Sequence, residues 1–139
     1  DYYASRGLGD VYKRQEYRLD DRIFLMGNTD STKREFLKSG CFLMPSRWEG
    51  MPMIILESLE MGVPVIAYDI TAMEPLVTDG MEGFIVKKFD TNAYAEKMLE
   101  IAENDELRYE FGRNARIKAR QFSKEIISEK WIELMEKHI

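Results

Sequence analysis

The sequence predicts an α/β domain, in which a parallel β-sheet is flanked by helices and followed by C-terminal helices. Three observations support this fold class: four short runs are apolar throughout, helical patterns lie between them, and three long helical patterns follow the last run. Strands without polar alternation are typical of a parallel sheet that is covered on both faces. Its crossover connections should be right-handed.

The first fifteen residues, DYYASRGLGDVYKRQ, do not fit this organisation, because they lack a clear period and join abruptly to a patterned segment. We interpret residues 1–15 as a non-native N-terminal scar. The alternative is a genuine loop and helix. The predicted domain then covers residues 16–139.

The first apolar run, Ile23–Met26, closes with a Gly-Asn pair that begins at Gly27. This pattern predicts a buried strand and a turn. Ser31 is placed to cap a helix over Thr32–Lys38, and Glu35 is placed for a capping box.

Further strands are predicted at Cys41–Met44, Val65–Tyr68 and Gly83–Val86. The loop Ser46–Pro52 joins the first of these to a helix over Met53–Met61. Three long helical patterns complete the chain: Thr91–Glu103, Asp105–Gln121 and Ser123–Ile139.

The last two helical patterns each carry a distinctive face. An apolar stripe on the last one is expected to pack on its own domain; it consists of Trp131, Leu134 and Met135. The preceding pattern has a basic face, which is expected to be solvated, with contact to anionic lipid as the alternative; it consists of Arg113, Arg116 and Arg120.

The composition excludes several classes of protein. Apolar residues make up 45% and charged residues 32%, which is typical of a globular domain. The net charge of −5 argues against a nucleic-acid partner. Cys41 is the only cysteine and His138 the only histidine, so we expect no disulfide, no metal site and no Cys-His catalytic pair. We expect no cofactor, no signal peptide, no membrane span and a cytoplasmic location.

The most informative segment is PSRWEGMPMIILES, residues 45–58, which joins a predicted strand to a predicted helix. In open parallel sheets, ligands bind beyond the carboxyl ends of the strands, where this loop lies. Pro52 stands near the first helical turn, where a missing N–H costs little. The free N–H groups of Met53 and Ile54, with a helix dipole of roughly +0.5 charge, suit an anion such as a diphosphate.

Glu57 is unusual because its neighbours on the predicted helix are apolar almost all round, so the helix should be buried. A buried carboxylate without a partner would cost several kcal/mol and therefore needs donors. The vicinal hydroxyls of a ribose provide two. A structural salt bridge or a solvent-facing acid fits the same pattern.

The loop before this helix offers three further candidates. Glu49 can accept hydrogen bonds from sugar hydroxyls, or it is an exposed loop acid. Gly50 lets the backbone approach a ligand closely, or it is an ordinary turn glycine. Trp48 packs against a sugar or a neighbouring domain, although plain core or rim packing is the expectation.

Glu49 and Glu57 have seven residues between them, within Pro-Ser-x-x-Glu-Gly-x-Pro-x-x-x-x-Glu-Ser. This resembles the Glu-(x)7-Glu motif of retaining glycosyltransferases, especially glycosyltransferase family 4. The segments MGVPVIA at 61–67 and TDGMEGFIV at 78–86 are similar to the family's G-x-P-V-I-A and D-G-x-x-G-x-x-V patterns. The predicted helix around GRNAR at 112–116 is also similar to the family's sequences. The resemblance as a whole covers residues 21–139.

The resemblance implies the C-terminal, Rossmann-like half of a GT-B fold, which binds a nucleotide-diphosphate sugar. The implied reaction transfers a hexose, with retention of configuration, to a glycan or lipid acceptor. The resemblance implies that Glu49 is catalytic and contacts the transferred sugar, and that Glu57 binds the ribose. The amides near Gly50 and Met51 would hold sugar hydroxyls, and those of Met53 and Ile54 would hold the diphosphate. The strand end at Gly27 would border the base.

Two departures from the family pattern stand out. Pro52 has no N–H to donate. Residues 69–75 read DITAMEP where the family often has D-x-G-G-x-P-E, which leaves the identity of the sugar open.

The resemblance also implies parts beyond this segment: an upstream basic pair and an N-terminal acceptor-binding domain. Losing such preorganised charge costs on the order of 10²–10³ in rate, so we expect the fragment alone to be inactive in transfer. Peripheral contact with the inner face of the membrane is a further expectation. The alternative function is a non-catalytic nucleotide-sugar-binding or interaction module of the same fold.

Overall fold

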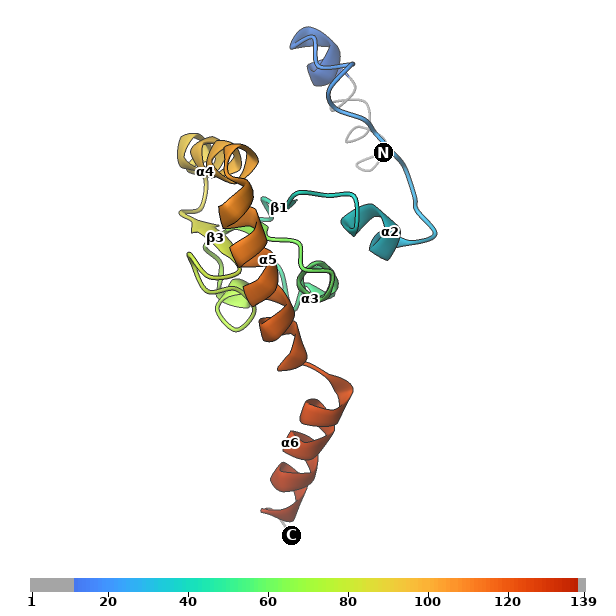
Figure 1. Ribbon diagram of the computed structural model, residues 1–139, viewed down its shortest axis with the longest axis vertical. Helices are drawn as coiled ribbons and strands as arrows, with labels where there is room; N and C mark the ends of the chain where they lie inside the picture. The colour runs from blue at the N-terminus through green and yellow to red at the C-terminus, as the bar shows by residue number, and fades with distance from the viewer. Residues whose placement is uncertain (1–11, 138–139) are drawn as a thin grey trace. The chain divides into compact units, whose positions relative to one another are not determined.

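The computed structural model describes residues 12–137. Its contacts divide the chain into two units, Asp1–Asp30 and Ser31–Ile139, and each is described by itself. Figure 1 traces the chain through both. Residues 1–11 lie outside the described part, as do His138 and the end of the last predicted helix. The reading of residues 1–15 as a scar, with a domain over 16–139, stays a prediction.

The first unit corrects one prediction, because Ile23–Met26 is not a strand. The segment has no regular structure, and its side chains are 46% to 76% exposed. An apolar run becomes a strand only where a neighbour pairs its backbone and another layer covers its side chains. No strand in the described part of the chain pairs with it. Gly27 follows with a φ of 67°, in the left-handed region that favours glycine.

The second unit contains a three-stranded parallel sheet in the order β1-β2-β3. The strands are β1 (Phe42–Met44), β2 (Val65–Tyr68) and β3 (Gly83–Val86). In the register, Phe42 pairs with Val65, and Val65 pairs with Gly83. This confirms the predicted parallel sheet, with three of the four predicted strands in their expected places.

The helices flank and follow the sheet, as predicted (Figure 1). The side chains of Asp90, Asn104 and Ser123 each accept an N–H bond at a helix start, which fixes where three of the helices begin. The elements are α2 (Thr32–Phe36), α3 (Met53–Glu60), the short 3-10 helix η1 (Thr71–Met73), α4 (Thr91–Glu103), α5 (Asp105–Arg120) and α6 (Lys124–Glu136).

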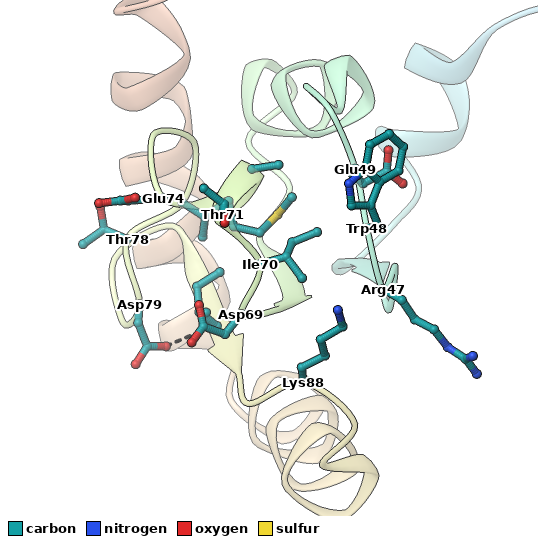
Figure 2. A pocket seen from close by; sticks show the side chains of 14 residues that line it. Arg47, Trp48, Glu49, Asp69, Ile70, Thr71, Glu74, Thr78, Asp79 and Lys88 are labelled. Carbon is teal, nitrogen blue, oxygen red and sulfur yellow. Dashed lines mark hydrogen bonds between the residues drawn. The ribbon is translucent and has the colours of Figure 1, made fainter.

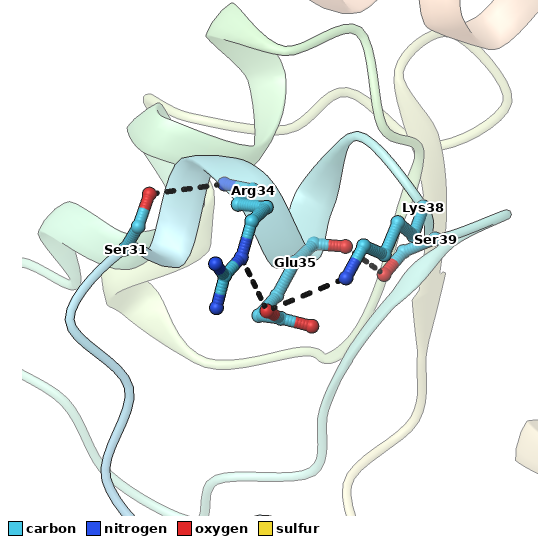
Figure 3. A network of polar contacts seen from close by, with 5 residues as sticks. All are labelled: Ser31, Arg34, Glu35, Lys38 and Ser39. Carbon is cyan, nitrogen blue, oxygen red and sulfur yellow. Dashed lines mark hydrogen bonds and ion pairs between the residues drawn. The ribbon is translucent and has the colours of Figure 1, made fainter.

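The shortest α-helix, α2, is fixed by a local polar network (Figure 3). Ser31 Oγ accepts a hydrogen bond of 3.3 Å from the Arg34 amide, which confirms the predicted cap. The Glu35 carboxylate lies 3.4 Å from Arg34 Nε and 3.8 Å from Lys38 Nζ. The helix ends at Phe36, two residues earlier than predicted.

Both faces of the sheet are buried, as expected for a parallel sheet. Val65 and Ala67 of β2 enter one core cluster with residues of α3 and α5. Ile66 and Tyr68 point the other way, into a cluster with residues of α4 and α5. In the second cluster, the Tyr94 hydroxyl donates to the Ile66 carbonyl over 2.5 Å. Burial raises the pKa of Tyr94 above its usual range.

The position of α3 is set by its close approach to α5. A Cβ atom added to Gly112 would lie 2.5 Å from the Gly62 carbonyl oxygen, so only glycine allows this packing. Four residues further along α5, Arg116 Nη2 donates a hydrogen bond to the Met61 carbonyl over 3.2 Å. This bond satisfies a backbone carbonyl that would otherwise be unpaired at the α3 C-terminus. The C-terminal end of α3 is therefore held against α5.

The last helix corrects another expectation. None of the side chains of α6 is buried, and Trp131 is 60% exposed. The predicted apolar stripe therefore does not pack on its own domain, since Trp131, Leu134 and Met135 are all exposed.

Candidate functional site

A cavity of about 730 Å³ opens at the carboxyl ends of the strands. Three segments build it: the loop after β1, the stretch from the end of β2 through η1 into the following turn, and the end of β3 with Lys88 after it. The side chains on its walls include Arg47, Trp48, Glu49, Asp69, Glu74, Asp79 and Lys88 (Figure 2). This is the edge at which ligands of open parallel sheets bind.

The cavity combines one inward-pointing cation with several carboxylates. The Lys88 side chain extends into it, whereas Arg47 points away (Figure 2). Both cations lie over the Phe89 ring, with the Arg47 guanidinium carbon 5.5 Å and Lys88 Nζ 5.4 Å from its centroid. Carboxylates accept hydrogen bonds from hydroxyl groups, and an ammonium donates to oxygens. The walls therefore suit a ligand with many hydroxyls.

Two of the nearby acids have structural partners. Asp79 Oδ1 accepts the Ile85 amide over 2.9 Å, and Glu82 Oε2 accepts the Thr78 amide over 2.7 Å. Glu82 is buried. These two carboxylates hold the turn before β3 in place. Glu49 is half-buried in the loop after β1, on the cavity wall where the sequence placed it.

The helix α3 begins directly after this loop and has no side-chain cap. Pro52 occupies the N-cap with φ −78°. Within the described part of the chain, no group accepts a hydrogen bond from the amides of Met53 or Ile54. Two N–H groups and the positive end of the helix dipole are thus available to an anion.

Gly50 and Met51 precede this helix start, and both are exposed. A Cβ atom at Gly50 would meet nothing within 4 Å, and its φ is not in the left-handed region. Neither packing nor backbone conformation therefore requires glycine here. Trp48 is 82% exposed, so the expected core or rim packing of this ring is wrong.

The surroundings of Glu57 differ from the prediction. The helix α3 buries Ile55, Ser58 and Leu59, while Glu57 faces outward and is exposed. The burial argument for this carboxylate is therefore wrong, because the sheet and α5 cover only one side of α3. Its hydrogen-bond partner is the Thr32 hydroxyl, which donates to Oε2 over 2.6 Å.

The two glutamates of the motif line different cavities. Glu57 lies on a second cavity of about 610 Å³ between α3 and the junction of α5 with α6. Its walls also include Met53, Leu56, Glu60, Arg116, Arg120 and Lys124. Gly27 belongs to the first unit, and its placement relative to either cavity is not assigned.

Sequence reasoning missed Lys88 and Thr32. Lys88 follows β3 by two residues, so the rule that ligands bind at strand carboxyl ends was a signal for it. The partnership of Thr32 with Glu57 joins residues 25 positions apart and has no signature in a single sequence. In the described residues, no group of three or more His, Cys, Asp or Glu side chains is arranged to hold a metal ion.

A parallel sheet whose strand ends carry carboxylates beside an uncapped helix start suits a hydroxylated, anionic ligand. Residues 11–118 match the family model described as Glycosyl transferases group 1, and the chain belongs to this family. This confirms the resemblance found in the motifs. No helix in the described part is both long and apolar enough to cross a membrane.

Individual relatives of this chain are named glycosyltransferases, in agreement with the family model. The chain is 26% identical, over 131 residues, to a poly(glycerol-phosphate) alpha-glucosyltransferase of Bacillus subtilis, covering 90% of this chain and 20% of that enzyme. It is 36% identical over 123 residues to an uncharacterized glycosyltransferase of Methanocaldococcus jannaschii, covering 84% of this chain and 35% of that protein.

A solved structure supports the fold class. Staphylococcus aureus TarM, crystallised as a mutant with fondaparinux, alpha-GlcNAc-glycerol and UDP, superposes with a TM-score of 0.83 at 28% identity. The match covers 89% of this chain and 26% of that one. The predicted class, one half of a GT-B fold, is confirmed. The chain spans 20% to 35% of the length of these relatives.

Proposed function

We propose that the chain is the donor-binding half of a retaining glycosyltransferase, which transfers a hexose from a nucleotide-diphosphate sugar to a glycan or lipid acceptor. One observation carries the proposal: an uncapped helix start follows directly on a loop whose carboxylate lines a polar cavity. The helix start suits the diphosphate, and the carboxylate suits the hydroxyls of the sugar.

Each candidate residue has a role in this proposal. The amides of Met53 and Ile54 bind the diphosphate, and the backbone near Gly50 and Met51 holds sugar hydroxyls. Glu49 contacts the transferred sugar on the cavity wall. The role of Glu57 toward the ribose rests on the family motif and on its exposed, hydroxyl-bonded carboxylate, and no longer on burial.

The proposed role of Gly27, which is to border the base of the nucleotide, rests on the family pattern alone. Two relatives support a nucleotide-sugar donor, since one is named a glucosyltransferase and the other was crystallised with UDP. The acceptor site and the upstream cations belong to the rest of a longer enzyme in this proposal, which works at the inner face of the cell membrane. The 139-residue chain alone then binds donor weakly and transfers little sugar.

Ligand-observed NMR tests the binding roles with the 139-residue chain, using UDP, GDP, ADP and the matching nucleotide-hexoses. Glu57→Ala should weaken binding of the preferred nucleotide about tenfold, because two hydrogen bonds to a charged group are lost. Glu49→Ala should leave nucleotide binding unchanged and remove the extra affinity for the nucleotide-hexose.

Failure of all three nucleotides to bind the parent chain would contradict the proposal. Equal nucleotide affinity of the parent and Glu57→Ala would refute the ribose role alone. Parental discrimination between nucleotide and nucleotide-hexose in Glu49→Ala would refute the sugar contact.

A further inference from the structure

We propose that Thr32 is a positioning residue for Glu57: its hydroxyl holds one carboxylate oxygen, so that the other faces the ribose hydroxyls of the nucleotide. This inference rests on the proposed function, in which Glu57 binds the ribose. It assigns a part of the binding site to α2, a helix that the Glu-(x)7-Glu motif does not include.

The hydrogen bond between these residues is short. Thr32 Oγ1 donates to Glu57 Oε2 over 2.6 Å, within the range of roughly 2.5–2.7 Å that is typical of a hydroxyl bonded to an ionised carboxylate. A threonine hydroxyl has a single proton to donate. That proton is directed at Oε2, so the other carboxylate oxygen keeps its acceptor positions.

The helix that carries Thr32 is anchored on both sides of it. Ser31 caps its first turn through the Arg34 amide. At its other end, Phe36 is buried and packs edge-on against Phe42 of β1, with ring centroids 5.4 Å apart. Thr32 itself is β-branched, so few rotamers are open to it. The donor therefore approaches Glu57 from a defined direction.

Glu57 needs such a donor because burial does not hold it. An exposed glutamate side chain loses rotamer freedom when a ligand fixes it, which opposes binding. In the described part of the chain, Thr32 is its one hydrogen-bond partner and no cation lies within 4.0 Å of it. Arg116, on the same cavity, donates instead to the Met61 carbonyl.

A neutral donor differs from a cation in what it leaves for the ligand. An arginine would occupy both carboxylate oxygens in a bidentate pair, whereas one hydroxyl occupies one. The carboxylate is thus oriented in advance and remains available on the side of the 610 Å³ cavity. The structural alternative, a bond that only joins α2 to α3, would affect stability and not the recognition of a ligand.

The test compares Thr32→Val and Thr32→Ser with a matched control, Thr91→Val. Thr32 and Thr91 each occupy the first position of a helix, after a side-chain cap. Ligand-observed NMR measures the affinity of each 139-residue chain for whichever of UDP, GDP and ADP binds the parent best, and for its 2′-deoxy form. Thermal unfolding of each variant reports stability separately.

Thr32→Val should bind the ribonucleotide about threefold to tenfold more weakly and should weaken binding of the 2′-deoxy form, which keeps only one of the two hydroxyls, by a smaller factor. Thr32→Ser, which keeps the hydroxyl, should restore most of the loss, and Thr91→Val should match the parent. A Thr32→Val chain that keeps the parental ratio of ribo to 2′-deoxy affinity overturns the inference, even if its melting temperature falls.

The two failures are distinguishable. If Glu57→Ala weakens the ribonucleotide but Thr32→Val does not, the proposed function stands and the positioning role is refuted. If Glu57→Ala itself has no effect, the ribose role fails first and the role of Thr32 fails with it.

Discussion

Two glutamates that look alike in the sequence motif have different surroundings. Glu49 is half-buried on a cavity wall with Asp69 and Lys88, whereas Glu57 is exposed on α3 and bonded to Thr32. The first carboxylate is positioned by its loop and the second by a hydroxyl from another helix. A substitution at either position therefore tests a different part of ligand recognition.

The buried hydroxyl of Tyr94 gives a prediction at the residue scale. Tyr94→Phe removes the bond to the Ile66 carbonyl and should lower the free energy of unfolding by about 1 kcal/mol, measured by urea denaturation. Tyr109→Phe is the control, because Tyr109 is 76% exposed.

The same substitution should change the pH dependence of stability. Burial raises the pKa of Tyr94 in the folded state, so the neutral form is the one that stabilises the fold. That stabilisation is complete below the unfolded pKa of about 10 and is lost as the pH rises toward the folded value. The difference between the parent and Tyr94→Phe should shrink above pH 10. A constant difference would contradict the prediction.

The elements that hold the site depend on one helix–helix contact. Exchanging a helical glycine for alanine normally stabilises a protein by about 1 kcal/mol. At Gly112, however, the new Cβ would lie 2.5 Å from the Gly62 carbonyl oxygen. Gly112→Ala should therefore destabilise the protein instead. It should lower the free energy of unfolding by about 1–3 kcal/mol, because α5 must move away from α3.

Gly40→Ala is the control for this prediction, since its Cβ would lie 3.6 Å from Arg108 Cδ, an ordinary contact. Urea denaturation of both variants measures the difference. A Gly112→Ala chain at least as stable as the parent would contradict this structural explanation, since the contact would then cost no more than the roughly 1 kcal/mol that alanine contributes in a helix.

The order of elements was predictable because its signals are local. Apolar runs marked β1, β2 and β3, and Ser31 marked the start of α2. The N-terminal end of α3 was predictable for the same reason, because Pro52 and the turn before it are neighbours in sequence. Where the predicted end of a helix falls within the described residues, it lies no more than two residues from the observed end.

The predictions that the structure contradicts depend on contacts between residues that are distant in the sequence. The segment Ile23–Met26 is as apolar as a buried strand, but pairing requires a neighbour that no local pattern supplies. The burial of Glu57 and of the α6 stripe depended on which elements cover α3 and α6. Periodicity tells which side of a helix is apolar; it does not tell whether another element packs there.

At the scale of the whole molecule, the cores belong to one unit. All residues of both buried clusters come from the second unit, Ser31–Ile139. Deleting residues 1–30 should therefore change the melting temperature by no more than about 2 °C, since none of the residues of these two clusters is removed. Calorimetry of the shortened chain measures this. A drop of about 10 °C or more would mean that the first unit contributes to the core.

Because α6 has no buried side chains, its amide hydrogens should exchange rapidly with the solvent. A helix of 13 residues that is not packed against another element is marginally stable in water. Its backbone hydrogens should exchange with deuterated solvent within seconds, while those of α5, locked against α3 through Gly112, should persist for far longer. Exchange along the C-terminal third of the chain thus distinguishes helix that is held by the protein core from helix that depends on its own turns.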